Sequence, residues 1–211
     1  MAKYTLMHKN IAVVDIELMN DTAAITQITT VYNLSHLPVG VCVNNGKVDR
    51  NSLNIWFKER SIPAYRDGLC SALEPLGRLS SDWLIEKCYG LSLSDQYWIN
   101  PVDNPLKWSE VNFFEHHFSE DVGNLLFNEF NESSIDLMSP DNTTDGWLKK
   151  RWRIIDGKRC LVKAGSGAYH QEAYNEVIAS IIMEKLNIAH IPEASCMIVG
   201  KPTDPLHKNK Y

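Results

Sequence analysis

The stretch WLKKRWRIIDGKRCLVKA, residues 147–164, decides the fold of the second half of this 211-residue chain. Residues 147–155 combine aromatic, aliphatic and basic side chains in a short run, which predicts a β-strand. The dipeptide Asp156-Gly157 follows, and it is preferred in a tight type I′ turn because both central residues need a positive φ. Residues 159–164 predict the returning strand. The stretch therefore predicts an antiparallel β-hairpin.

The segments on either side extend this hairpin into a larger pattern. Ile135-Asp-Leu-Met138 predicts a short strand, and the polar loop 139–146 connects it to the hairpin. After the hairpin, Gly165-Ser-Gly167 leads into a helix predicted over residues 171–186, and residues 194–199 predict a fourth strand. Three strands, one helix and a further strand is the order of elements in the N-lobe of a kinase.

The first part of the chain predicts a mixture of strands and helices. Strands are expected over residues 11–18 and 24–32, and Asn45-Gly46 marks a turn. Three helices are expected after that turn, and Asp49 or Asn51 caps the first while Ser81 caps the third. These helices contain residues 53–57, 66–76 and 80–89.

The polar segment 128–134 is the expected domain boundary. The predicted fold class is α+β, with a mixed N-terminal subdomain over residues 1–133. It is followed over residues 134–202 by a kinase-like N-lobe, which is an antiparallel sheet with one helix of the αC type. Residues 203–211 form a polar tail.

Composition excludes several classes of protein. A hydrophobic content of 44% and a charged content of 22% are ordinary for a globular protein. The net charge of −5 argues against a protein whose main task is to wrap DNA. No stretch has the length of a membrane span or the pattern of a signal peptide, so a cytoplasmic location is expected.

The cysteines and histidines predict no metal site. The five cysteines form no C-x-x-C pair, which favours buried reduced thiols over a zinc cluster or a disulfide framework. His116 and His117 are adjacent, and neighbouring histidines on irregular chain rarely point to one centre.

Lys163 and Glu176 are the candidate chemical pair. Lys163 ends an otherwise apolar strand, where an ammonium group is costly to bury unless an anion or carboxylate meets it. Glu176 lies on the following helix beside small residues that let the helix approach a sheet, while Tyr174, Ile178 and Ile182 belong to its apolar side. A strand lysine paired with a helix glutamate holds the α- and β-phosphates in protein kinases. The alternative is that both side chains are ordinary solvated surface residues.

Three further stretches each leave two interpretations open. In the loop 139–146, backbone N–H groups and the hydroxyls of Thr143 and Thr144 suit phosphate oxygens, or the loop is an ordinary hairpin connection. Gly165-Ser-Gly167 is either an anion site at a helix N-terminus or a flexible connection. The basic run 149–153 is either a nucleic-acid contact or a solvated sheet face, and strand alternation favours the latter.

The chain resembles the bacterial HipA-like serine/threonine kinases in three places. These are residues 137–152, Lys163, and Asn175-Glu-Val-Ile-Ala179. The resemblance is greater to a phage- and Firmicutes-type branch, which shares LSLSDQYWI at residues 91–99 and VNFF at residues 111–114. It extends from about residue 7 to about residue 202, and so covers most of the chain.

This resemblance implies specific roles. Lys163 would bind the phosphates of ATP, supplied with Mg²⁺, and Glu176 would orient that lysine. The loop from Ser139 to Gly146 would be the phosphate loop, with Thr143, Thr144 and Gly146 as contacts. Ser139, Thr143 or Thr144 would be the site of autophosphorylation that disables nucleotide binding. The first part of the chain would be the extra subdomain that such kinases carry before the N-lobe.

The chain departs from the family in lacking the C-lobe, which supplies the catalytic-loop aspartate and the magnesium-binding aspartate. Asp95 and Asn100 match the Asp-x-x-x-x-Asn spacing, but they precede Lys163, so the match is interpreted as chance. We therefore expect the ATP-phosphate-binding portion of a HipA-like protein kinase that is not catalytically competent alone.

The partners expected on this interpretation are a separate C-lobe chain or a second copy, because the N-lobe should expose apolar residues such as Met183, Leu186 and Met197. The protein substrate is not indicated by the sequence, and no direct nucleic-acid or membrane partner is expected. The alternative function is a non-catalytic protein-binding module of a toxin–antitoxin or phage-related system. A DNA-associated regulator is a third possibility, which the net charge disfavours.

Overall fold

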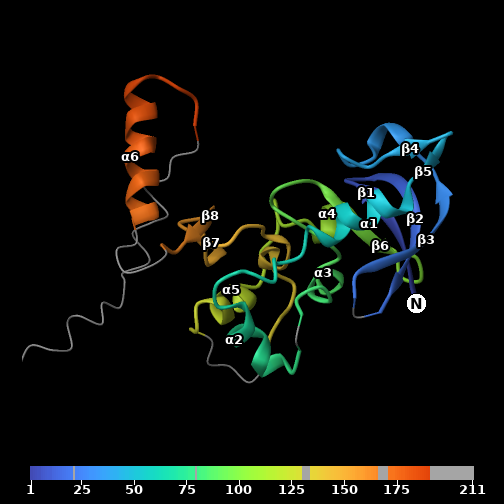
Figure 1. Cartoon of the computed structure of the whole chain (residues 1–211), viewed down its shortest axis with the longest axis horizontal. Helices are drawn as coiled ribbons and strands as arrows, with labels where there is room; N and C mark the ends of the chain where they lie inside the picture. The colour runs from blue at the N-terminus through green and yellow to red at the C-terminus, as the bar shows by residue number, and fades with distance from the viewer. Residues whose placement is uncertain (21, 79, 130–133, 166–170, 191–211) are drawn as a thin grey trace, which may run out of the picture. The chain divides into compact units, whose positions relative to one another are not determined.

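A computed structural model gives the fold of the chain (Figure 1). It describes residues 1–20, 22–78, 80–129, 134–165 and 171–190. The chain divides into two compact units, Met1–Trp147 and Leu148–Tyr211. Helices and antiparallel strands are both present, so the predicted α+β class is confirmed. Within the described residues, every helix is too short or too polar to cross a membrane.

A four-stranded antiparallel sheet is the framework of the first unit. In spatial order its strands are β3 (Ala24–Val31), β2 (Ile11–Met19), β1 (Ala2–His8) and β6 (Tyr97–Pro101). Successive side chains of a strand point to opposite faces, and one face here buries Leu6, Ile16 and Leu18. The strands predicted over residues 11–18 and 24–32 are confirmed as β2 and β3.

Helix α1 (Arg50–Lys58) packs on this sheet and closes the first core. Its N-cap is Asp49, whose carboxylate accepts a hydrogen bond from the amide of Ser52 at 2.7 Å. Asp49, rather than Asn51, is therefore the cap. Leu53 and Phe57 lie one helical turn apart and are both buried in the core cluster of the sheet.

Two side chains from the N-terminal half of α1 cover part of the outer edge of β3. Arg50 Nη1 donates to the carbonyl of Ile25 at 2.8 Å, and Asn54 Oδ1 accepts from the amide of Ile25 at 2.8 Å. Side chains thus satisfy both main-chain groups of Ile25 that point away from β2.

Shorter elements complete the first unit. They are η1 (Leu34–His36), β4 (Val43–Asn44), β5 (Lys47–Val48), α2 (Leu69–Leu73), η2 (Glu74–Leu76), α3 (Leu84–Lys87), α4 (Trp108–Val111), α5 (Asp121–Leu126) and η3 (Pro140–Thr143). The predicted turn at Asn45-Gly46 joins β4 to β5, and both of its residues have positive φ. A second apolar cluster lies among α2, α3 and α5, and a third contains Trp98, Trp108 and Phe113.

Two helix predictions were too long or wrongly capped. The segment 66–76 forms α2 and then the 3₁₀ turn η2, because Gly68 precedes the first with a positive φ and Pro75 lies in the second. The segment 80–89 is helical only from Leu84 to Lys87. Ser81 does not cap it, since the Ser81 hydroxyl donates to the carbonyl of Ile62 at 2.6 Å.

Residues 134–147 belong to the first unit, so the division falls later than the boundary predicted after residue 133. The predicted strand over residues 135–138 is wrong. Ile135 and Leu137 pack against the helical cluster of α2, α3 and α5 instead. The carbonyl of Leu137 accepts from the Asn142 side chain at 2.7 Å, so a side chain rather than a neighbouring strand satisfies it.

The second unit contains the predicted hairpin and helix. Strands β7 (Lys150–Ile155) and β8 (Lys158–Lys163) pair antiparallel, and helix α6 (Gln171–Lys185) follows. Asp156 and Gly157 have φ values of 49° and 73°, which confirms the tight turn. The expected fourth strand over residues 194–199, the tail 203–211, and Ser166 and Gly167 lie outside the described residues.

The basic run 149–153 is not a uniformly solvated face. Arg151 stands opposite Val162 in the hairpin register, and both residues are buried. Lys150, Trp152 and Arg153 are half-buried. The prediction of a solvated sheet face is therefore wrong at Arg151, which lies on the inner side of the pleat.

Candidate functional site

Lys163 and Glu176 form an ion pair within the second unit. The ammonium Nζ of Lys163, at the end of β8, lies 2.8 Å from Oε2 of Glu176 on α6. The predicted approach of these two side chains within salt-bridge distance is confirmed. Their side chains are 27% and 36% exposed, so solvent reaches the pair.

The hairpin register places Lys163 on the side of β8 that meets α6. Lys163 stands opposite Lys150, and Val162 beside it is buried on the other face. The amide of Ala164 donates to the carbonyl of Lys149 at 2.8 Å, which continues the ladder one residue past the strand. Strand pairing before Lys163 and the Ala164 hydrogen bond after it therefore fix the main chain at this residue.

This arrangement suits an anion that approaches from solvent. A lysine ammonium has three N–H donors, so it can bind a carboxylate and a phosphate oxygen together. A solvent-exposed pair contributes only about 0–1 kcal/mol to stability, because water screens it. The pair therefore adds little to stability.

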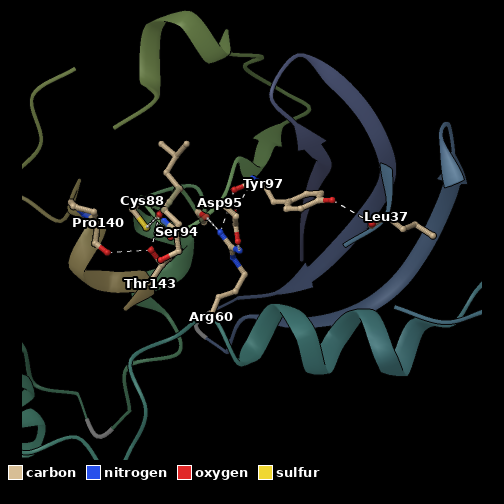
Figure 2. Close-up of polar contacts among 11 residues, drawn as sticks. Leu37, Arg60, Cys88, Ser94, Asp95, Tyr97, Pro140 and Thr143 are labelled. Atoms are coloured by element: carbon tan, nitrogen blue, oxygen red, sulfur yellow. Dashed lines mark hydrogen bonds and ion pairs between the residues drawn. The ribbon is translucent and has the colours of Figure 1, made fainter. Parts of the chain in front are cut away.

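The loop from Ser139 to Gly146 lies in the first unit, and its hydroxyl side chains are buried. Thr143 Oγ1 donates to the carbonyl of Leu91 at 2.9 Å and lies 3.2 Å from that of Pro140. Figure 2 marks the contact between Thr143 and Pro140. Thr144 Oγ1 donates to the carbonyl of Asp141 at 2.9 Å. In this conformation both threonine hydroxyls bind main-chain carbonyls, and so they stabilise the loop.

Main-chain amides of the loop have local partners as well. The amide of Asp141 donates to the Ser139 hydroxyl at 3.3 Å, and that of Thr144 donates to the carbonyl of Asp141 at 3.3 Å. The amide of Gly146 donates to the Asp145 carboxylate at 2.6 Å. These amides would have to give up their partners before they could bind a phosphate group.

Arg66 holds the loop in place, a role that sequence reasoning missed. Its Nη1 donates to Thr144 Oγ1 at 2.8 Å, its Nη2 to the carbonyl of Thr144 at 2.6 Å, and its Nε to the carbonyl of Gly146 at 3.0 Å. Burial lowers the pKa of Arg66, and the carboxylates of Asp141 and Asp145 oppose that shift. No local pattern could reveal contacts between residues so far apart in the sequence.

Asp95 belongs to a second buried network, centred on Arg60 (Figure 2). The guanidinium of Arg60 pairs with the Asp95 carboxylate, donates to the carbonyl of Gly90 at 2.8 Å, and lies 4.9 Å from the ring centre of Trp56. Asp95 also accepts from the amide of Tyr97 at 2.9 Å. These contacts place Asp95 in a network that joins α1 to β6.

Asn100, the second residue of that spacing, ties the end of β6 to the following loop. Its side chain donates to the carbonyl of Leu106 at 3.0 Å and accepts from the amide of Leu106 at 2.8 Å. Both residues of the Asp-x-x-x-x-Asn spacing thus have structural contacts. Among the described residues, no three His, Cys, Asp or Glu side chains are grouped to hold a metal ion.

Comparison with known proteins found no matching family model, no matching curated protein and no matching solved structure.

Proposed function

We propose that this chain is the ATP-phosphate-binding portion of a HipA-like serine/threonine protein kinase. The single observation that supports the proposal most is the 2.8 Å ion pair between Lys163 on β8 and Glu176 on α6. In this role Lys163 contacts the phosphates of ATP, and Glu176 directs the lysine toward them. The hairpin and the helix supply the strand and the αC-type element that this geometry needs.

Phosphoryl transfer requires groups that these 211 residues do not supply in the kinase order. A catalytic-loop aspartate must accept the substrate proton, and a second aspartate must hold Mg²⁺. Both follow the lysine strand and the helix in a kinase. Asp95 precedes Lys163 and is paired with Arg60. On this proposal the described residues contact the phosphates of MgATP, and catalysis belongs to a C-lobe outside residues 1–211.

The side chains of the loop from Ser139 to Gly146 are engaged in contacts within the fold. Thr143 and Thr144 bind main-chain carbonyls, and Arg66 binds Thr144. The loop has to leave this position before its amides and hydroxyls can bind phosphate or before Ser139 can be modified. Phosphate binding by the described conformation therefore depends on Lys163 rather than on the loop.

The test is a titration of the full chain with MgATP, followed by NMR shifts of amides in β8 and α6. Lys163 contacts only the phosphates of ATP in this proposal, so we expect a dissociation constant no tighter than roughly millimolar, or about 4 kcal/mol. Lys163→Ala should abolish the shifts. Lys158→Ala removes the same charge from an exposed position on the same strand and should preserve them. Equal loss of the NMR shift changes in both variants would show that ATP binding depends only on the net charge of the strand.

A specific observation favours a second candidate function, that of a protein-binding module. Four apolar side chains on one face of α6 are about half exposed or more. They are Tyr174 (66%), Ile178 (54%), Ile181 (48%) and Ile182 (52%). Of the three residues named as expected to be exposed, Leu186 is exposed, Met183 is half-buried, and Met197 lies outside the described residues.

Exposed apolar stripes of this kind mark interaction sites on many proteins. Light scattering over a range of concentrations tests this candidate, with Ile178→Asp and Ile182→Asp as the variants. A stable partner or self-association that these variants abolish and that MgATP does not change would favour the module over the kinase portion. A monomer at every concentration, with ATP shifts that depend on Lys163, would favour the kinase portion.

A further inference from the structure

His8 and His36 face each other across a single hydrogen bond. His8 is the last residue of β1 and His36 is the last residue of the 3₁₀ turn η1. Their Nδ1 atoms lie 2.8 Å apart, and their ring centres are 5.1 Å apart. His8 also stacks on Tyr97 of β6, with ring centres 4.6 Å apart and an angle of 21° between the planes. The imidazole of His8 is thus held between the sheet and the turn.

The turn is attached to the sheet by two side-chain contacts at this point. One is the His8–His36 bond. The other is a hydrogen bond from the Tyr97 hydroxyl to the carbonyl of Leu37 at 3.3 Å, which Figure 2 shows. Leu37 follows η1 directly and packs against the first core cluster. Loss of the histidine bond therefore weakens the attachment of residues 34–37 to β1 and β6.

We propose that His8 and His36 form an acid-sensitive latch, which holds η1 on the sheet at neutral pH and releases it at mildly acid pH. A bond between two imidazole nitrogens needs one N–H donor and one bare nitrogen that accepts. One proton added to the pair leaves this bond possible, because a single imidazolium can still donate to its neutral neighbour. A second proton places two N–H groups and two positive charges against each other, and the bond is lost.

The charges around His8 favour its neutral form. Burial lowers the pKa of His8, and the charges of His36 and Lys9 lower it further, while Asp95 acts in the opposite direction. Asp95 is already paired with Arg60 at the end of α1, and Tyr97 contributes a neutral ring. The released state therefore binds the proton more readily than the latched state.

The sign of the pH dependence follows from that difference. A histidine whose pKa is depressed in the folded state stabilises that state fully above its ordinary pKa of about 6.5. This contribution is lost as the pH falls from about 6.5 through the lower folded-state pKa. The latch is closed at pH 7.5 and opens on the acid side of 6.5.

The test uses the full chain and two NMR measurements between pH 7.5 and 5.0. The first follows the His8 ring proton, and the second follows the amide shifts and the hydrogen exchange of residues 34–37. In the wild type, the amide shifts should titrate with the same midpoint as His8, below 6.5. Exchange of the Leu37 amide, corrected for its intrinsic pH dependence, should quicken roughly three- to tenfold, as expected for one lost hydrogen bond.

His36→Gln is the informative variant, because glutamine can still bond to His8 but cannot take a proton. Its His8 midpoint should rise, and residues 34–37 should no longer respond to pH. His117→Gln, at an exposed histidine of the same unit, should behave as the wild type does. The latch would be refuted if the titration midpoint of His8 were unchanged in His36→Gln. It would also be refuted if the amides of residues 34–37 in the wild type did not respond to pH.

Discussion

Replacing Arg66 by methionine should unfold the first unit more easily, because Arg66 connects the segment after α1 to the loop 139–146. Methionine keeps the apolar stem but removes the guanidinium. Two acceptors on buried Thr144 then lose a donor, while the carbonyl of Gly146 is only half-buried and can bind water. An unsatisfied buried acceptor costs about 1–3 kcal/mol, so two cost about 2–6 kcal/mol.

The buried carboxylate of Asp141 increases this cost. Asp141 is fully buried, and the charge of Arg66 acts on it favourably. Removing one partner of a buried charge interaction is destabilising by about 3–5 kcal/mol. The two estimates describe overlapping contacts, so they are not added. We expect a loss of about 3 kcal/mol in the free energy of unfolding of the first unit.

Urea unfolding followed by tryptophan fluorescence measures this loss, through a lower midpoint at an unchanged slope. The matched control is Arg78→Met, which removes an exposed guanidinium that lies 5.1 Å from the ring centre of Trp83. An exposed cation–π contact contributes about 0.5–1 kcal/mol, so this control should lose clearly less stability than Arg66→Met does. Equal losses in Arg66→Met and Arg78→Met would refute the assignment of Arg66 as the group that holds the loop.

Three further predictions concern the proposed site and a buried thiol of the third apolar cluster. The purified chain alone should incorporate no label from radioactive MgATP, and incorporation that Lys163→Ala abolishes would contradict this. Glu176→Gln should change the stability of the second unit by less than about 1 kcal/mol, because the ion pair is partly exposed; a loss above about 2 kcal/mol in thermal unfolding would show a structural role instead. Burial raises the pKa of the Cys88 thiol to about 11, so at pH 8 iodoacetamide should label exposed Cys42 and Cys70 while Cys88 reacts only in denaturant. Mass spectrometry of the peptides reports the order, and early labelling of Cys88 would show that its pocket opens.

Local chemistry in the sequence accounts for the features that were predicted well. Asp156-Gly157 specifies its turn because few other residue pairs adopt positive φ at both positions. Asp49 caps α1 with its own side chain, only three residues from the amide that it accepts. Lys163 and Glu176 are thirteen positions apart, and their approach follows from the positions of Lys163 at the end of β8 and of Glu176 near the start of α6.

Long-range contacts account for what the sequence did not indicate. The loop 139–146 has the composition of an exposed polar connection, yet Arg66 and Leu91 bind it from distant parts of the chain. These partners satisfy the hydroxyls of Thr143 and Thr144 and the carbonyls of Thr144 and Gly146, and this favours burial of the loop. The segment 135–138 was expected as a strand on its apolar alternation, and it packs on helices instead. Pattern alone does not distinguish these two ways of burying Ile135 and Leu137.

The side chains at the edge of β3 bear on solubility during expression. The strand Ala24–Val31 has the sequence AITQITTV, which contains no charge and no proline, and such edges readily pair with other chains. Arg50 and Asn54 occupy the outward main-chain groups of Ile25 and so leave a shorter stretch open to an incoming strand. These two side chains of α1 therefore oppose aggregation, because they block part of the β3 edge from pairing with another chain. We expect a chain that lacks both side chains to accumulate in inclusion bodies even if its purified native state retains the same core.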